Sequence, residues 1–225
     1  MAETRPPPLF LADALGLDFL NSIATPVDTP VEWLADGADL VAWLRHADLV
    51  PQDIADTMLR TAIPGELDAV AAQARALREW FRHFVRGHKG SPLGPDSVTE
   101  LAPLNQILAR DEEYGQIGMA PQCGDDGHAH DEDCTPARLV WQPARRWRSP
   151  ESLLQPIARA MADLVCQEDF SHVRACEGPA CTLLFVDKTN GNKRRRWCSM
   201  AVCGNRAKVQ AHRERKRLEK AAAAP

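Results

Sequence analysis

Four cysteines in the C-terminal part of the chain form two pairs with the same internal spacing, Cys176-x4-Cys181 and Cys198-x4-Cys203. Zn²⁺ in structural sites takes four thiolate or imidazole ligands in a tetrahedron, and ligands paired in sequence let two short turns supply all of them. Four buried free cysteines are the alternative, but free cysteine does not usually recur in matched pairs beside charged residues. The spacing therefore predicts a structural zinc site at Cys176, Cys181, Cys198 and Cys203.

The residues between and after the pairs predict the shape of this zinc module. A β-prone run at 182–186 is followed by a turn signal at 190–192 and a basic stretch at 193–197, which together predict a hairpin with a basic second arm. Ser199 is a good N-cap for a helix that carries the second cysteine pair and continues toward the C-terminus. A knuckle, a hairpin and a helix in this order are typical of a treble-clef finger.

Positive charge is concentrated in the same segment. Between Arg174 and Lys220 there are 13 Lys and Arg against 4 Asp and Glu, although the whole chain carries a net charge of −4. This asymmetry indicates that one part of the chain binds a polyanion, although a solvated basic tail would show it too. The residues that we expect to contact nucleic acid are Arg194, Arg195, Arg196, Arg206, Lys208, Arg213 and Arg217.

Two stretches of the chain resemble a known family. The first combines the cysteine pairs with Phe185-x-Asp187, Arg195-Arg196-Trp197-Cys198-Ser199-Met200 and Cys203-Gly204-Asn205-Arg206-x-Lys208. It resembles the CGNR zinc finger of bacterial proteins whose N-terminal part is the ABATE domain. The second, Leu17-Asp18-Phe19-Leu20-Asn21-Ser22 followed by Leu40-x2-Trp43-Leu44, is similar to the opening of that domain. The resemblance implies a stress-induced transcriptional regulator that contains zinc and binds DNA.

Length and composition fit two unequal domains. A chain of 225 residues accommodates one domain of about 150 residues and a module too small to fold without a metal. We expect an α+β fold: residues 1–170 form a predominantly helical, ABATE-like domain with a small β element, and residues 171–225 form the zinc finger with a basic C-terminal helix. The odd number of cysteines, 7, fits a reducing cytoplasm, and no apolar stretch is long enough to span a membrane.

Apolar periodicity predicts most helices of the first domain. The clearest runs from Pro64 to Gly87, and others cover 39–46, the residues after Pro51, and 153–166 with Cys166 on the apolar side. Two capping boxes, Thr29–Glu32 and Ser97–Glu100, predict further helix starts, the first for a short helix over Trp33 and Leu34. The β-prone centre of 138–142 predicts a strand that pairs with residues near Trp147.

A compact cluster in an acidic segment suggests a second metal site. Cys123, His128, His130 and Cys134 lie within twelve residues, and thiols with imidazoles bind soft divalent metals. A polar segment that contains glycine is also typical of a mobile surface loop. Both interpretations stay open at this point.

Four residues of the first domain are candidates for binding a small-molecule effector. Asp18 and Asn21 interrupt an apolar stretch, and Trp33 and Trp43 follow it. Polar side chains in such a setting either satisfy backbone groups or line a pocket, and the structural role is the commoner one. An effector site here is therefore a hypothesis.

Motifs of enzymes are missing from the sequence. It contains no dinucleotide-binding or phosphate-binding glycine loop, no nucleophile elbow and no H-E-x-x-H. A zinc ion with four thiolate ligands has no open position for substrate, so we expect no enzyme.

Three functions remain. We favour a cytoplasmic regulator that binds DNA through its finger, with the first domain sensing an effector or forming a homodimer. The alternatives are a protein that binds structured RNA and a zinc-stabilised module for protein interaction or redox response.

Overall fold

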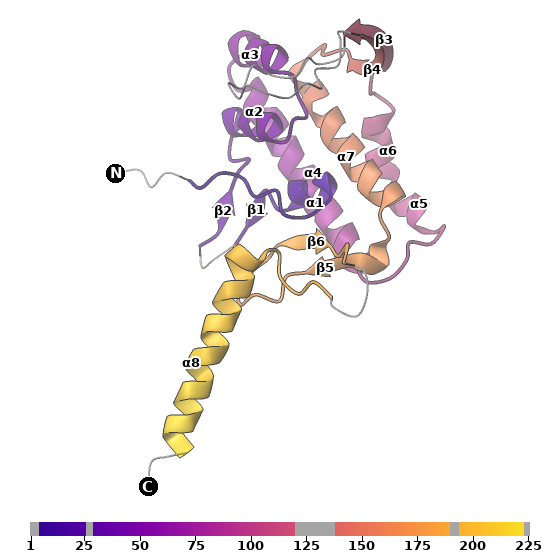
Figure 1. The fold of residues 1–225 in the computed structure, drawn as a ribbon. Coiled ribbons are helices and arrows are strands. Elements are labelled where there is room, and N and C mark those ends of the chain that lie inside the picture. Colours follow the sequence, from indigo (N-terminus) through magenta and orange to yellow (C-terminus); the bar gives the residue numbers. More distant parts are fainter. Residues whose placement is uncertain (1–4, 26–28, 120–137, 190–193, 223–225) are drawn as a thin grey trace.

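The computed structural model describes residues 5–25, 29–119, 138–189 and 194–222 and shows a predominantly helical protein with small antiparallel sheets (Figure 1). The helices are α1 (Leu15–Leu20), α2 (Gly37–His46), α3 (Gln52–Thr61), α4 (Glu66–His88), α5 (Ser97–Glu100), α6 (Ala102–Leu108), α7 (Leu154–Gln167) and α8 (Asn205–Ala222). The strands pair as β1 (Ile23–Ala24) with β2 (Val31–Glu32), β3 (Glu113–Met119) with β4 (Leu139–Arg145), and β5 (Val173–Ala175) with β6 (Leu184–Val186). Among the described helices, none combines the length and apolar character needed to cross a bilayer.

Helix α4 is the spine of the helical body, as its periodicity predicts. Its buried apolar side chains recur every three or four residues: Val70, Ala71, Ala74, Leu77, Phe81, Phe84 and Val85. The short helix α1 is buried along almost its whole length and contacts α4, α7 and β6. Because α1 touches all three, one apolar core extends from the helical body to the cysteine cluster.

Helices α2, α3 and α7 also lie where the sequence predicts them. Pro156 falls in the first turn of α7, where its missing N–H removes no intrahelical bond. Cys166, however, is exposed, so the prediction that it belongs to the core is wrong. It lies two residues beyond the buried Leu164, which turns its side chain roughly 200° away on a helix of 3.6 residues per turn.

The capping box at Thr29–Glu32 does not start a helix. Val31 and Glu32 form β2 instead, and the N–H of Trp33 donates to the carbonyl of Ser22 at 2.8 Å. The carboxylate of Glu32 accepts from the N–H of Leu34 and from the guanidinium of Arg78. A partner far away in sequence therefore holds this carboxylate in an extended segment.

The strand at 138–142 is present but pairs differently from the prediction. It extends through Pro143 to Arg145 and pairs with β3, not with residues near Trp147. The sequence signal of β3 is weak because Gly115 and Gly118 interrupt it. The box at Ser97 is likewise only partly confirmed, since α5 begins at that residue without a side-chain cap.

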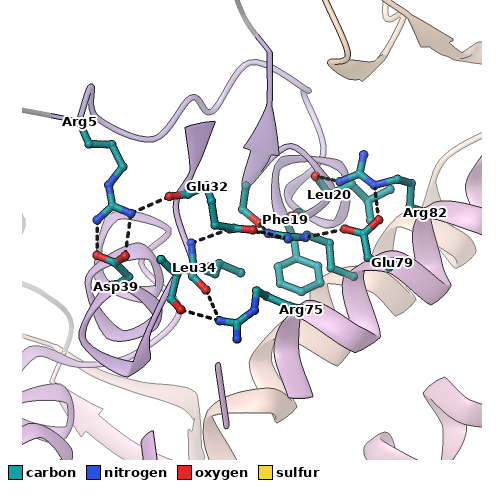
Figure 2. Close-up of polar contacts among 12 residues, drawn as sticks. Arg5, Phe19, Leu20, Glu32, Leu34, Asp39, Arg75, Glu79 and Arg82 are labelled. Carbon is teal, nitrogen blue, oxygen red and sulfur yellow. Dashed lines mark hydrogen bonds and ion pairs between the residues drawn. The ribbon is translucent and has the colours of Figure 1, made fainter. Parts of the chain in front are cut away.

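A buried cluster of charges fastens β2 and the end of α1 to α4 (Figure 2). The side chain of Arg78 is only 2% exposed and donates to both carboxylate oxygens of Glu32, at 2.8 and 2.6 Å, and to the hydroxyl of Ser22 at 2.9 Å. Arg82 donates to the carbonyl of Leu20 and to the carboxylate of Glu79. These arginines are part of the interior, which apolar periodicity does not reveal.

Replacing Glu32 by Gln should destabilise the fold, because it removes the carboxylate that accepts two hydrogen bonds from the buried guanidinium of Arg78 and leaves only the exposed Glu79 as its counter-charge. Loss of one partner of a fully buried pair costs roughly 3–5 kcal/mol, and we expect the lower end of this range because the side chain of Glu32 is 27% exposed. Although burial alone would raise it, Arg78 holds the pKa of Glu32 below its ordinary value, so this stabilisation is complete at neutral pH and is lost as the pH falls through the lowered pKa. Urea denaturation measures the effect.

The matched control is Asp163→Asn, which removes the carboxylate of an ion pair with Arg159 in which the two side chains are 43% and 53% exposed. An exposed pair contributes about 0–1 kcal/mol. Equal losses of stability in the two variants would contradict the assigned role of Glu32.

Candidate metal centre

The sulfur atoms of Cys176, Cys181, Cys198 and Cys203 all lie within 4.8 Å of one another. Three of these residues are buried, and Cys181 is half-buried. Tetrahedral zinc with bonds of about 2.3 Å requires sulfurs about 3.8 Å apart, so small shifts of the side chains would close the site around an ion. The arrangement can hold one metal ion.

Two turns bring the cysteines together. Cys176 follows β5, and the N–H of Cys181 closes the first turn on the carbonyl of Gly178 at 3.0 Å. A Cβ on Gly178 would stand 2.8 Å from the sulfur of Cys203, so the close approach of the two turns requires glycine there. The first pair is thus fixed by its backbone.

The second pair is fixed by a capped helical turn. The hydroxyl of Ser199 accepts from the N–H of Val202 at 3.0 Å, which confirms Ser199 as an N-cap. A π-helical turn over Met200–Gly204 contains Cys203 and leads directly into α8. A Cβ on Gly204 would stand 2.5 Å from the sulfur of Met200, so this glycine allows tight packing beside the centre.

The predicted hairpin between the pairs is not the one observed. Strand β6 pairs with β5, and residues 194–199 form no strand. The reason is that β5 precedes the first cysteine pair and lies beside β6 once Cys176 turns the chain. The treble-clef assignment itself stays a prediction.

The electrostatics of the cluster favour a cation. Cys198 donates to the sulfur of Cys181 and, together with the other thiols, lowers the pKa of Cys181 to about 5. The same contact raises the pKa of Cys198. Burial raises the pKa of Cys203 to about 12. Four adjacent sulfurs therefore do not all ionise without a positive charge among them. Backbone N–H groups of Gly178 and Cys198 also point at the sulfur of Cys176, at 3.4 and 3.2 Å, as they do toward thiolates. The donor set suits a soft divalent ion.

The metal-bearing segment is docked on α1. The side-chain amide of Asn21 exchanges two hydrogen bonds with the backbone of Leu184, at 2.8 and 2.9 Å, and the N–H of Val186 donates to the carbonyl of Ala12 at 2.8 Å. One carboxylate oxygen of Asp18 accepts from the N–H groups of Leu11 and Ala12, at 2.9 and 3.0 Å. Asp18 and Asn21 thus organise the junction.

The other candidate effector residues also have structural partners. Trp33 donates its ring N–H to the carbonyl of Pro6, and Trp43 is buried against Phe10 and Phe19. Some hollows of the described surface lie elsewhere, such as one of about 340 Å³ lined by Leu77, Ile107, Gln155 and other residues. Effector binding at Asp18, Asn21, Trp33 and Trp43 stays a prediction.

Arg195 is engaged at the same junction. It pairs with Asp13, donates to the carbonyls of Leu11, Trp197 and Cys198, and lies over the ring of Phe185 at 4.3 Å. Contact of Arg195 with DNA stays a prediction and would have to compete with these bonds. This structural role is one that the sequence analysis missed.

The remaining basic candidates lie at the surface. Arg194 is exposed, and Arg196 pairs with Glu177 at 2.6 Å and covers the ring of Trp197. On α8, Lys208, Arg213 and Arg217 are exposed and Arg206 is partly buried. Figure 1 shows α8 extending away from the body of the protein. The four residues of the second metal cluster, Cys123, His128, His130 and Cys134, lie outside the described residues.

Comparison with known families agrees with this geometry. Residues 13–168 match the profile of the ABATE family, described as "Putative stress-induced transcription regulator". The chain belongs to the ABATE family. Residues 172–216 match the CGNR zinc finger, so the cysteine cluster lies inside a region that matches a metal-binding module. No curated protein matches the chain.

Replacing Cys198 by Ser should abolish metal binding and loosen the segment around the cluster. Metal binding to such a site supplies folding free energy where its ligands are. Amide hydrogen exchange should become faster in β6 and at the start of α8, while α4 stays protected. Elemental analysis of the purified protein and exchange mass spectrometry measure both effects. The control is Cys166→Ser, which replaces an exposed cysteine and should change neither result.

Replacing Asp18 by Asn should remove a dependence of stability on pH. Burial raises the pKa of Asp18 to about 7 from 3.8, so between these values the unfolded state loses the proton first and wild-type stability falls as the pH rises. Asn keeps the oxygen that accepts both backbone bonds. The variant should therefore gain stability relative to wild type across this range, at about 1.4 kcal/mol per pH unit. The prediction is wrong if the free energy of unfolding changes with pH in the same way for the wild type and the variant from acid to neutral pH.

Proposed function

We propose that the protein is a zinc-containing transcription regulator that binds DNA through α8 and the residues around its metal centre. The observation that carries the proposal is the position of α8, a basic helix that begins two residues after a cysteine of the centre and extends free of the body (Figure 1). Membership in a family described as "Putative stress-induced transcription regulator" supports the same function.

The charge and dimensions of α8 suit a DNA groove. Its 18 residues carry seven Lys and Arg against two Glu, and at 1.5 Å per residue it is about 27 Å long. The major groove, about 12 Å wide, admits one α-helix. Arg206, Arg213 and Arg217 share one side of the helix, because seven and four residues are close to whole turns. The geometry supports a face of α8 directed at phosphates and base edges.

The metal centre gives this helix its orientation. Cys203 lies in the π-helical turn that runs into α8, so an ion at the four sulfurs would fix the direction of the helix relative to the body. Zinc is the ion that we propose, because a site of four cysteines in a reducing compartment is the usual structural zinc site. Zinc bound there supplies folding energy, and four thiolates leave no position for a substrate, so we propose no catalysis at this site.

The rest of the chain has the properties of a regulatory body. The whole chain has a net charge of −4 and the segment from Arg174 to Lys220 has +9, so the rest of the chain has −13. A negative charge of this size does not attract DNA. We propose that this body, in a cytoplasmic protein, receives a signal such as a small molecule.

Salt-dependent binding of duplex DNA tests the function. The logarithm of the affinity should fall linearly with the logarithm of the salt concentration, with a slope of roughly −0.9 per phosphate neutralised. Arg213→Ala and Arg217→Ala should each reduce this slope by about one if they contact phosphate, or relax the preference for one base pair if they contact a base. Fluorescence anisotropy with a duplex of random sequence and with genomic fragments measures both.

The matched control is Arg60→Ala, which removes an exposed arginine from α3 in the body. Its slope should equal that of the wild type. The proposal is wrong if Arg213→Ala and Arg217→Ala bind like the control while they retain the metal. Stronger binding of a structured RNA than of any duplex DNA would favour the RNA-binding alternative.

A further inference from the structure

The hairpin of β3 and β4 presents an apolar face to solvent. Its cross-strand pairs on this side are Gly115 with Pro143, Ile117 with Trp141, and Met119 with Leu139. Side chains alternate along a strand, so these six residues, called the hairpin face below, lie on one side of the sheet. Its large side chains are strongly exposed: 71% for Ile117, 53% for Met119, 71% for Leu139 and 73% for Trp141.

The ring of Trp141 covers part of the hairpin face. A Cβ on Gly115 would stand 1.7 Å from the ring of Trp141, so the ring extends across the neighbouring strand above this glycine. An aromatic ring laid over a cross-strand glycine closes the gap in the surface that the glycine leaves.

Within the described residues, the outer part of the hairpin face stays open, whereas Gly115, Trp141 and Pro143 also line a hollow with Leu108 of α6 and Arg159 of α7. Strands β3 and β4 pair only with each other, and the hairpin lies at the opposite end of the body from α8 (Figure 1). A two-stranded hairpin is only marginally stable in water without packing on one side. Exposed apolar patches of this size on soluble proteins mark contact sites.

The area of the hairpin face matches the core of a small dimer interface. Each of its four large side chains exposes on the order of 125 Å² of apolar surface, so the face offers roughly 500 Å². Two copies would bury roughly 1,000 Å² together, the lower limit for a specific interface, and polar residues at the rim would add to it.

Two arginines beside the hairpin face are paired with carboxylates. Arg148 pairs with Glu112 at 2.5 Å, and Arg159 lies 3.7 Å from Glu113. Each of these two arginines therefore lies beside a carboxylate and not alone at the surface. A second copy presents the same apolar face, and twofold symmetry lets one surface serve both partners.

We propose that the hairpin face is the contact through which two copies of this chain form a symmetric dimer. The contact is made by packing of the two faces. Pro143 lacks an N–H and is typical of a strand that is not extended at its edge, so continuous strand pairing through β4 is disfavoured.

Sedimentation velocity of the full-length protein tests the proposal. From low- to high-micromolar concentration the wild type should shift from the 24.9 kDa of one chain toward twice that mass. Trp141→Lys places a charge in the centre of the hairpin face and should weaken association at least tenfold. Ile117→Lys should have the same effect, which protects the conclusion if one variant folds poorly.

The matched control is Gln116→Lys, which adds the same charge on the opposite side of β3. It should dimerise like the wild type. Circular dichroism should show that all three variants keep their helical content. A wild type that sediments as one chain at every concentration would overturn the proposal, as would a Trp141→Lys variant that dimerises as well as Gln116→Lys.

Discussion

The hydrogen bonds of Asn21 with the backbone of Leu184 join two parts of the chain that are 163 residues apart. An amide side chain that is buried must find both a donor and an acceptor, and strand β6 offers one of each. Since α1 also contacts α4 and α7, this single strand is held against the centre of the helical body. The position of the cysteine cluster, and of the helix that follows it, depends on this junction.

Charge explains why the junction and the cluster belong together. Asp187 is buried and accepts from the N–H groups of Thr189 and Arg195. The guanidinium of Arg195 in turn reaches the carbonyls of Leu11 and Cys198, one from each side of the junction. An arginine with five donors in a fixed plane suits this bridging role, which a lysine would fill poorly. The finger is therefore attached to the body by polar contacts as well as by its apolar core.

Local signals in the sequence predict some features well. The periodicity of 64–87 predicts α4, and Ser199 predicts the start of the turn that carries Cys203, because each depends on residues a few positions apart. The equal spacing of the cysteine pairs predicts a cluster that the structure brings together. Family resemblance added the regulator class, which spacing alone does not contain.

Features that depend on distant partners were not predictable in the same way. The sequence places Glu32 in a capping box, but in the structure its carboxylate accepts from Arg78. The sequence makes Arg195 a candidate phosphate ligand, but in the structure it pairs with Asp13 and donates to the carbonyl of Leu11. Strand β3 has too little β propensity to be recognised without β4. In each case a contact with a distant part of the chain determines the local structure.

The basic helix α8 and the hairpin face lie far apart in the structure (Figure 1). DNA contacts through α8 and self-association through β3 and β4 would use opposite ends of the molecule, so neither occupies the surface that the other needs (Figure 1). Helix α7 lies between the two: it packs on α1, and its Arg159 lies 3.7 Å from Glu113 at the base of the hairpin. Because α1 also contacts β6, the contacts of α7 and α1 connect the hairpin with the segment that carries the metal centre. If the two proposed surfaces are coupled, substitutions at the contact of α7 with α1 should alter both of them, whereas substitutions on α8 should alter only DNA binding.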